Sequence, residues 1–156
     1  MEQNILSHQQ IQYKIERLQE FKALLNNRNE TLNEFVRLAE IKNRWFSQDN
    51  IWLSINAIVD EFLDPEKLAN WLGSYKDQPV EKNIGIIVAG NIPLVGFHDV
   101  LCAFVLNAPT QIKLSSKDEV LMRYFITQLQ ELDITWKVEI TERLVGFDAV
   151  IATGSD

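Results

Sequence analysis

Residues Ile84–Gly96 read Ile-Gly-Ile-Ile-Val-Ala-Gly-Asn-Ile-Pro-Leu-Val-Gly, a pattern that indicates a strand, a turn and the start of a helix. The first six residues are apolar or glycine, and so short an apolar run is typical of a strand covered on both faces. Gly90 permits backbone angles that a side chain would forbid, and Pro93 fixes φ, so the strand should end there. This order of elements predicts a βαβ unit. Because open parallel sheets bind ligands beyond the carboxyl ends of their strands, we expect a ligand over Asn91.

The composition is typical of a soluble chain with an acidic balance. The chain has 156 residues, of which 46% are apolar and 24% charged, enough for one domain with a hydrophobic core. The net charge of −7 argues against non-specific binding to nucleic acid or to an acidic membrane surface. The longest apolar run in the expected helix after Gly96, Val100–Leu106, is too short to cross a bilayer. We therefore expect neither nucleic acid nor a membrane among the partners.

Cys102 is the single cysteine, which excludes an internal disulfide and a metal site built from several cysteines. One cysteine favours a reducing compartment, and the N-terminal residues, which include Glu2, contain no apolar segment of the signal-peptide kind. We therefore expect a cytoplasmic protein. Cys102 lies among large apolar residues of a predicted helix, with no adjacent base or cation, so its thiol should have a raised pKa and stay inert.

The first half of the chain is expected to be helical, because residues 1–76 contain one glycine, Gly73, and one proline, Pro65. Apolar residues at three- and four-residue steps predict helices over about 7–26, 30–42 and 48–63. A fourth helix has a clear start, since Asp64 can cap it and Pro65 suits its first position, and Gly73 can end it. We assign residues 1–76 to a helical region and residues 77–156 to a region built on a sheet.

Four aromatic residues gather in the helical half: Trp45, Phe46, Trp52 and Trp71. They allow two interpretations. They could line a groove for an acyl chain or for a partner protein, or they could pack between the helices and against the sheet. We favour packing, because aromatic residues at helical spacing usually belong to a core.

After Gly96 the sequence alternates between helical and strand patterns. We expect a helix to about residue 107, a second helix from about 116, and strands near 111–114, 135–139 and 147–152. Ser116 and Glu119 match a capping box, with serine at the cap and glutamate three residues on. The alternation predicts an α/β fold with a parallel sheet and right-handed crossovers. The chain stops at Asp156 directly after a strand and its turn, with no helix to cover that strand, so we expect a truncated fragment.

The candidate site residues follow the predicted strands. Asn91 offers an amide that could stabilise an oxyanion, although asparagine also simply forms turns. Lys113 could bind a phosphate or a ribose, or it could be an ordinary exposed lysine. The backbone amides of Gly154 and Ser155 could bind a phosphate, or they could belong to an ordinary turn. His98 could reach the site, but we favour a local hydrogen bond near the start of its helix. The sequence matches neither the Gly-x-Gly-x-x-Gly fingerprint nor a Walker loop, and no metal site is predicted.

Three segments, in this order, resemble the aldehyde dehydrogenase superfamily: residues 84–93, Gln-Ile-Lys-Leu-Ser-Ser at 111–116, and Phe-Asp-Ala-Val-Ile-Ala-Thr-Gly-Ser at 147–155. The corresponding family pattern is strand-Asn-x-Pro, strand-Leu-Lys-Pro-Ser-Glu and strand-Thr-Gly-Ser. Two stretches, Gly-Asn-Ile-Pro-Leu-Val-Gly-Phe-His-Asp and Ala-Thr-Gly-Ser-Asp, more closely resemble the acyl-CoA reductases of the LuxC type. The helical N-terminal region is also similar to that family, so the resemblance covers nearly the whole chain.

The resemblance implies an enzyme that reduces a fatty acyl-CoA or another acyl thioester to an aldehyde with NADPH, through a cysteine acyl-enzyme. It implies a Rossmann-like, aldehyde-dehydrogenase-like sheet, of which this chain holds the N-terminal part. Asn91 would supply the oxyanion-hole amide, Lys113 would contact the adenosine ribose, and Gly154 and Ser155 would lie along the pyrophosphate and nicotinamide side. The family's catalytic cysteine lies well after the Thr-Gly-Ser turn and so outside this chain, and Cys102 does not match it.

Two positions depart from the pattern of many aldehyde dehydrogenases. Leu114 replaces a proline, which should be neutral for chemistry. Ser116 replaces the glutamate that binds the adenosine ribose in NAD-dependent members. A hydroxyl there, with Ser115 beside it and the cations of Lys113 and Lys117 nearby, can accommodate a 2′-phosphate, so we expect NADPH (NADP⁺) as the cofactor.

A function of another class stays open. The chain could be a non-catalytic α/β interaction module whose helices dock a partner subunit, and a homo-oligomer is also compatible with the sequence. Measurable affinity for NADPH would favour the enzyme. Absence of that affinity, together with a stable subunit complex, would favour the module.

Overall fold

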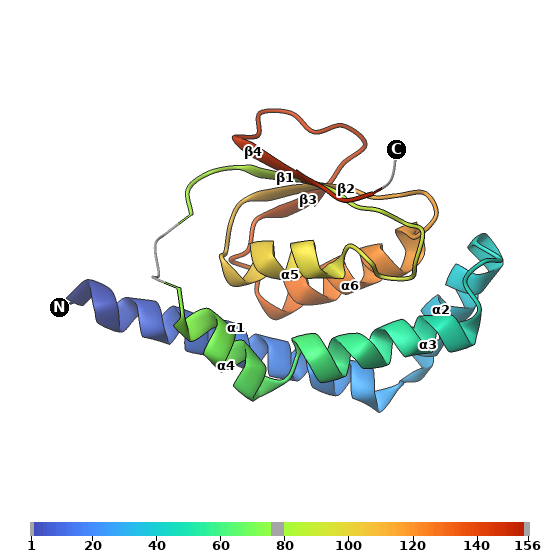
Figure 1. Cartoon of the computed structure of the whole chain (residues 1–156), viewed down its shortest axis with the longest axis horizontal. Coiled ribbons are helices and arrows are strands. Elements are labelled where there is room, and N and C mark those ends of the chain that lie inside the picture. The colour runs from blue at the N-terminus through green and yellow to red at the C-terminus, as the bar shows by residue number, and fades with distance from the viewer. Residues whose placement is uncertain (1, 76–79, 155–156) are drawn as a thin grey trace.

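Figure 1 shows the computed structural model, which describes residues 2–75 and 80–154, with side chains from residue 9 onward. The N-terminal region is helical, as the sequence predicts. It contains α1 (Glu2–Asn27), α2 (Glu30–Lys42), α3 (Gln48–Ala57), η1 (Ile58–Phe62) and α4 (Pro65–Gly73). η1 is a π-helical turn that continues α3, so the helix expected over 48–63 changes its hydrogen bonding part-way. α1 begins earlier than expected.

Side-chain caps start three of these helices. Asn29, Ser47 and Asp64 each accept a hydrogen bond from the backbone N–H three residues on, at 2.8, 3.2 and 2.8 Å. Each bond satisfies an N–H group that the first turn of a helix leaves without a partner. The predicted start of α4 is confirmed, because Asp64 is its cap and Pro65 is its first residue.

Four parallel strands form the sheet in the order β3-β2-β1-β4. They are β1 (Ile84–Ile87), β2 (Thr110–Lys113), β3 (Val138–Ile140) and β4 (Ala149–Ala152), with α5 (Phe97–Val105) after β1 and α6 (Glu119–Leu132) after β2. The α/β class and the parallel sheet interleaved with helices are therefore confirmed. Residues 141–148 contain no helix and lead from β3 to β4 across the sheet.

One face of the sheet is covered by helices, and the other face is largely open. In Figure 1, α5 and α6 lie beneath the sheet, and the N-terminal helices form a further layer beneath that pair. Ile86 and Ile112 are fully buried, whereas Ile87 is 39% exposed. The connection from β3 to β4 covers part of the open side, since a Cβ on Gly85 would lie 2.8 Å from Leu144 Cδ1. The expectation that β1 is covered on both faces is therefore wrong at its carboxyl end.

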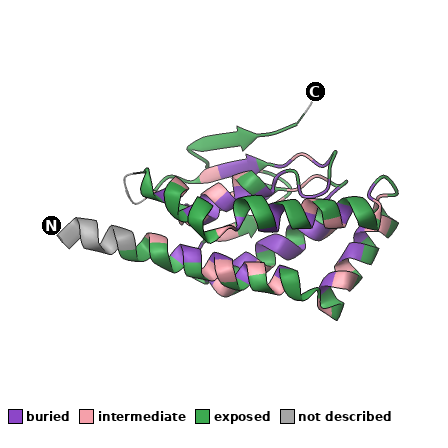
Figure 2. Ribbon diagram, turned by 60° about the horizontal axis from the view of Figure 1, so that its bottom comes forward, coloured by how far each residue is buried: buried purple, intermediate pink, exposed green. Residues whose placement is uncertain are grey.

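β4 is the least covered strand of the sheet. All four of its residues are exposed, and Figure 2 shows the strand entirely in the exposed colour. Among the described residues it pairs on one side only, with β1, from Ile84 opposite Ala149 to Ile87 opposite Ala152. Parallel strands are normally buried on both faces, so this apolar edge strand departs from the usual pattern.

A single hydrophobic core joins the helical region to the sheet. At its centre, Phe21 of α1, Phe97 of α5 and Phe125 of α6 contact one another, with ring centroids 5.9, 5.3 and 5.6 Å apart. The edge-to-face arrangement of two of these pairs is a favourable geometry for aromatic rings. Because α1 packs on the helices that cover the sheet, the regions expected on either side of residue 76 share one core.

The packing interpretation of the aromatic residues in the helical half is confirmed in part. Phe46 is buried, and Trp52 and Trp71 pack against the core while staying partly accessible. Trp45 is 88% exposed, so the interpretation is wrong for this residue. Trp45 and Phe46 follow one another in the turn between α2 and α3, where Phe46 lies in the core and Trp45 lies outside it.

Candidate functional site at the carboxyl edge of the sheet

Three loops meet where β2, β1 and β4 end. Ile87 of β1 lies in register with Lys113 of β2 on one side and with Ala152 of β4 on the other. Since neighbouring strands lie about 4.8 Å apart, the Cα atoms of Lys113 and Ala152 are roughly 10 Å apart. The chain runs outward from β1 through β2 to β3 and then returns to the other side as β4. Such a reversal of strand order is where open α/β sheets form their binding crevice.

The loop after β1 packs tightly against the loop after β2. A Cβ added to Gly90 would lie 2.2 Å from Ser115 Oγ and 3.1 Å from Lys117 Cβ. The φ of Gly90 is not positive, so the glycine is required by this close approach and not by the special backbone angle expected from the sequence. The Ser115 hydroxyl also accepts a hydrogen bond from the Lys117 N–H, at 3.3 Å. Ser115, a predicted cofactor residue, is therefore held between the two loops.

Asn91 lies at the outer side of the first loop and is exposed. Within the described residues its side-chain amide makes no hydrogen bond, so it can donate to a molecule that reaches this edge. The neighbouring Ile92 and Val95 are 53% and 41% exposed and add apolar surface beside it. Gly96 closes the loop against the residue that follows β1, because a Cβ at this position would lie 1.6 Å from Val88 Cγ1.

The end of β2 and the loop after it carry three exposed polar side chains, those of Lys113, Ser116 and Lys117. The predicted capping box is wrong, since α6 begins at Glu119 and Ser116 does not cap it. The chain first makes a tight turn, in which the Asp118 N–H donates to the Ser115 carbonyl oxygen at 3.1 Å, and this turn delays the helix. As a result, Ser116 stays outside the helix and is exposed. In the sequence it lies between Lys113 and Lys117.

The loop after β4 lies beside the end of β1. The Thr153 N–H donates to the Ile87 carbonyl oxygen at 3.2 Å. Gly154 has a φ of +154°, a value that side-chain-bearing residues rarely adopt, and a Cβ there would lie 3.9 Å from Ala89 Cβ. Gly154 is exposed, so its backbone is open to a ligand. Ser155, the other residue predicted in this turn, lies outside the described residues.

Asp118 is a member of this edge that sequence reasoning missed. Its side chain is buried, with 3% exposure, and its Oδ2 accepts a hydrogen bond of 2.6 Å from the Leu94 N–H of the first loop. Burial raises the pKa of Asp118 to about 7, against the smaller opposing effect of the Leu94 bond. No local signal distinguishes this aspartate from the solvent-facing acids of a helix start, because its partner lies 24 residues away.

Cys102 has a neighbouring base after all. His98, one helical turn earlier on α5, places Nδ1 4.0 Å from the Cys102 Sγ, which corrects the expectation of no adjacent base. Burial, and to a lesser extent the charge of Asp99, nevertheless raises the pKa of the thiol, as expected. The His98 ring packs beside Phe62 and Trp71, with centroids 5.3 and 6.3 Å away, and these aromatic side chains line a hollow of about 210 Å³ next to α5.

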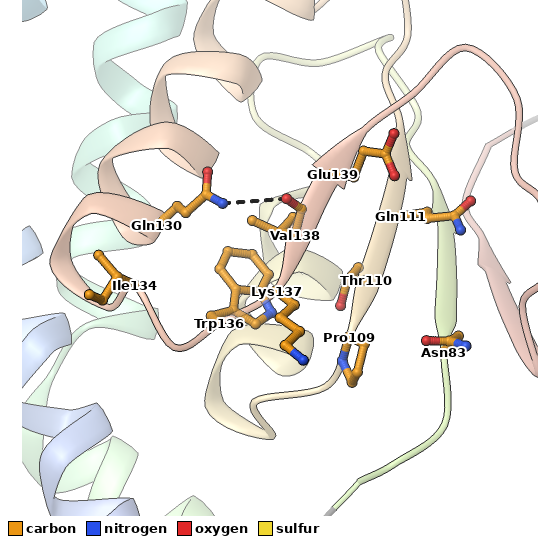
Figure 3. A pocket seen from close by; sticks show the side chains of 10 residues that line it. All are labelled: Asn83, Pro109, Thr110, Gln111, Gln130, Ile134, Trp136, Lys137, Val138 and Glu139. Carbon is orange, nitrogen blue, oxygen red and sulfur yellow. Dashed lines mark hydrogen bonds between the residues drawn. The ribbon is translucent and has the colours of Figure 1, made fainter.

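A larger and more open hollow of about 350 Å³ lies at the opposite, amino edge of the sheet (Figure 3). Thr110 and Val138, the first residues of two strands, line it together with the indole of Trp136. The Trp136 Nε1 donates to the Ala108 carbonyl oxygen at 3.0 Å, so the indole is part of the fold. Open parallel sheets bind ligands at the other edge, and we therefore place the candidate site beyond the carboxyl ends of the strands.

The described residues contain no group of three or more histidine, cysteine, aspartate or glutamate side chains that could hold a metal ion. Among the helices of that part of the chain, none is long and apolar enough to cross a membrane. Comparison with protein-family models, with curated proteins and with solved structures finds no match to this chain. The chemistry of the candidate site therefore has to be argued from its own residues: an exposed amide, two exposed lysines, and backbone amides on three adjoining loops.

Proposed function

We propose that this chain is the cofactor-binding part of a Rossmann-like acyl-CoA reductase, which reduces an acyl thioester to an aldehyde with NADPH. The observation behind this proposal is the strand order β3-β2-β1-β4, which sets the loops of Asn91, Ser115 and Gly154 side by side. The same order occurs in the first four strands of the doubly wound dinucleotide-binding sheet, whose full order is 3-2-1-4-5-6. The acyl-accepting cysteine would come from residues outside this sequence, since burial raises the pKa of the Cys102 thiol on α5 and so disfavours the reactive thiolate.

The residues at this edge suit an anionic dinucleotide. Lys113 and Lys117 supply two exposed cations, and Ser116 an exposed hydroxyl, for the adenosine ribose and its 2′-phosphate. Gly154 has no side chain to hinder a pyrophosphate that approaches the backbone beside β1. When bound, NADPH would supply the hydride for the reduction, and the residues of this chain would bind and orient it.

Asn91 would act on the acyl substrate. Its amide is exposed and makes no hydrogen bond within the described residues, and the contact between Gly90 and Ser115 fixes the start of its loop. A donor in this place can stabilise the negative charge that develops on the thioester oxygen, an effect of about 2.7–4 kcal/mol in other enzymes. The apolar surface of Ile92 and Val95 beside it suits the acyl part of the substrate.

The preference for NADPH over NADH rests on Ser116. A carboxylate in its place would repel a 2′-phosphate about 4 Å away by roughly 1 kcal/mol in water and about 4 kcal/mol at an effective dielectric constant of 20. Ser116 carries no charge, and its hydroxyl is not used to cap α6. We therefore expect tighter binding of NADPH than of NADH, and a shift toward NADH in Ser116→Glu.

Isothermal titration calorimetry of the 156-residue chain with NADPH tests the proposal. Lys113→Ala should weaken binding about tenfold or more, because hydrogen bonds to charged groups contribute about 1.5–3 kcal/mol. Lys137→Ala is the matched control, since Lys137 is also an exposed lysine of the sheet region but lines the hollow at the amino edge. Equal loss of affinity in both variants would contradict a cofactor site at Lys113.

The open face of the sheet supports a second candidate function, a non-catalytic module that docks a partner subunit. Val150 and Phe147 are 47% and 43% exposed, although parallel sheets are normally covered on both faces. A partner or a second copy could supply that cover. Absence of NADPH binding, together with a stable complex in size-exclusion chromatography with light scattering that Val150→Glu disrupts, would favour this module over the reductase.

A further inference from the structure

Asp118 connects two of the loops that form the candidate site. Its Oδ2 lies 2.6 Å from the nitrogen of Leu94, in the middle of the loop that begins with Gly90 and Asn91. Asp118 itself ends the turn that carries Ser115, Ser116 and the exposed Lys117. A buried carboxylate on one loop therefore holds the main chain of the other.

The backbone at Leu94 needs such support. Leu94 has a φ of +59°, in the left-handed region that residues with a side chain seldom occupy. A conformation of this kind is strained and persists only when its surroundings impose it. The Leu94 side chain is buried, and the backbone N–H of Leu94 donates the hydrogen bond that the Asp118 carboxyl group accepts. The loop thus stores strain at the point where the carboxylate attaches.

The turn of Asp118 is anchored on its other side by the helical region. The Asn43 side chain, at the end of α2, donates to the Lys117 carbonyl oxygen at 3.1 Å. On the site side, the Ser115 hydroxyl packs against Gly90. The turn is therefore attached to the helical region independently of its bond to the Leu94 amide.

The surroundings of the Asp118 carboxyl group are unusual for a charge. Its second oxygen, Oδ1, is buried and has no hydrogen-bond partner among the described residues. Lys42 of α2, together with Lys117 and Glu119 of its own turn, lines the same cavity of about 140 Å³. The loop from Gly90 to Gly96 contributes no titratable side chain. Among the residues that the structure describes, the carboxylate thus has one hydrogen-bond partner, the Leu94 N–H, and forms no ion pair.

We propose that Asp118 is a positioning residue that latches the loop of Asn91 through the Leu94 amide, and that the latch is closed when its carboxyl group is neutral and loosened when the group is ionised. A catalytic role for Asn91 rests on the proposed function, whereas the attachment of its loop to Asp118 does not. The latch sets whether the exposed amide is held in one place at the carboxyl edge.

The direction of this pH dependence follows from the different proton affinities of the latched and the released state. In the latched state the pKa of Asp118 is about 7, because the group is buried, whereas a released and solvated carboxyl has its ordinary value of 3.8. Protons therefore bind more tightly to the latched state. As the pH rises from about 4 to about 7, the equilibrium shifts toward release by up to about tenfold per pH unit, and above that range it is constant.

Hydrogen exchange of backbone amides, followed by NMR on the full chain, measures the latch directly. The protection factor of the Leu94 amide should fall at least tenfold between pH 5 and pH 8. Asp118→Asn keeps an oxygen acceptor of the same shape without a titrating proton, so its Leu94 protection should be independent of pH. Asp118→Ala removes the acceptor, and its protection at Leu94 should be low at every pH.

Two controls separate the latch from general effects. Glu119→Gln removes the neighbouring exposed carboxylate and should leave the pH dependence at Leu94 unchanged. The buried Leu18 of α1 reports global unfolding, and its protection should exceed that of Leu94 at every pH, which shows that the Leu94 amide exchanges by local opening. A protection factor at Leu94 that does not change with pH, or a change that persists in Asp118→Asn, would overturn the proposal.

NADPH titrations of the same variants distinguish the latch from the enzyme function. If the Leu94 amide responds to pH as expected but NADPH does not bind, the latch stands and the cofactor site is wrong. If NADPH binds and Leu94 does not respond, the cofactor site stands and the latch is overturned.

Discussion

At the scale of single residues, a buried lysine attaches the first helix to the rest of the molecule. The Lys14 Nζ lies 2.5 Å from Asp133 Oδ2, 2.8 Å from Asn107 Oδ1 and 4.1 Å from the centre of the Phe104 ring. Burial lowers the pKa of Lys14 in spite of the bond to Asp133. Burial would raise the pKa of Asp133, but hydrogen bonds from Lys14 and Thr135 hold it below its usual value. Lys14 and Asp133 thus form a buried ion pair.

Removing one charge of this pair should lower the free energy of unfolding far more than removing both charges. We expect Lys14→Met to lower the free energy of unfolding by about 3–5 kcal/mol, because it leaves Asp133 as a buried, unpaired charge. Adding Asp133→Asn should recover part of that loss. Urea unfolding measures both, and Lys67→Met, which breaks an exposed ion pair with Glu61, is the control that should change little. A double variant less stable than Lys14→Met would contradict this account.

Gly96 is required by close packing. A Cβ at this position would overlap Val88 at 1.6 Å, whereas a Cβ at Gly73, at the end of α4, would meet nothing within 4 Å. We expect Gly96→Ala to cost about 1–3 kcal/mol of stability, since the loop or β1 must shift to make room. Gly73→Ala should be neutral or slightly stabilising, because alanine restricts the unfolded chain. Urea denaturation of the two variants should show this difference, and similar values for both would refute it.

At the scale of elements, one predicted cap is real and another is not. The Asp64 carboxylate accepts a hydrogen bond from the Lys67 N–H at 2.8 Å and starts α4, whereas Ser116 makes no cap for α6. We expect Asp64→Ala to destabilise the protein by about 1 kcal/mol, within a usual range of about 0.5–2. Ser116→Ala should change the stability by less than about 0.5 kcal/mol. Chemical denaturation of the two variants measures both losses of stability. Equal losses would mean that Ser116 does cap α6.

At the scale of the whole molecule, Asp118 should make stability depend on pH. Its pKa of about 7 in the folded chain exceeds its ordinary value of 3.8, so its stabilising contribution is complete below about pH 4 and is lost as the pH rises through about 7. Asp133, with a lowered pKa, acts in the opposite sense: its contribution is present above its ordinary value and is lost as the pH falls.

From pH 5 to pH 8 the Asp118 contribution alone should lower the free energy of unfolding by about 2–3 kcal/mol, at 1.36 kcal/mol per pKa unit. Urea unfolding curves of the native chain and of Asp118→Asn at several pH values measure it as the difference between the two slopes. Parallel pH profiles for the two proteins would show that Asp118 is not the group responsible.

Several features of the fold could be predicted from the sequence because their causes are local. Caps such as Asp64 act over three residues, and the helical periodicity of α2 and the apolar run of β1 are visible within a single element. The alternation of strands and helices was enough for the α/β class and for a parallel sheet. For the candidate site, the same local signals placed Asn91 and Lys113 at strand ends, where the structure has them exposed.

Only the tertiary structure decided how those elements meet. It set the strand order β3-β2-β1-β4, the open face of the sheet, the exposure of Trp45 and the inward turn of Asp118. These features depend on contacts between residues far apart in the chain, such as the 24 residues between Leu94 and Asp118. Local patterns carry no information about such distances, because burial and the pKa of a carboxyl group depend on everything that surrounds it in space.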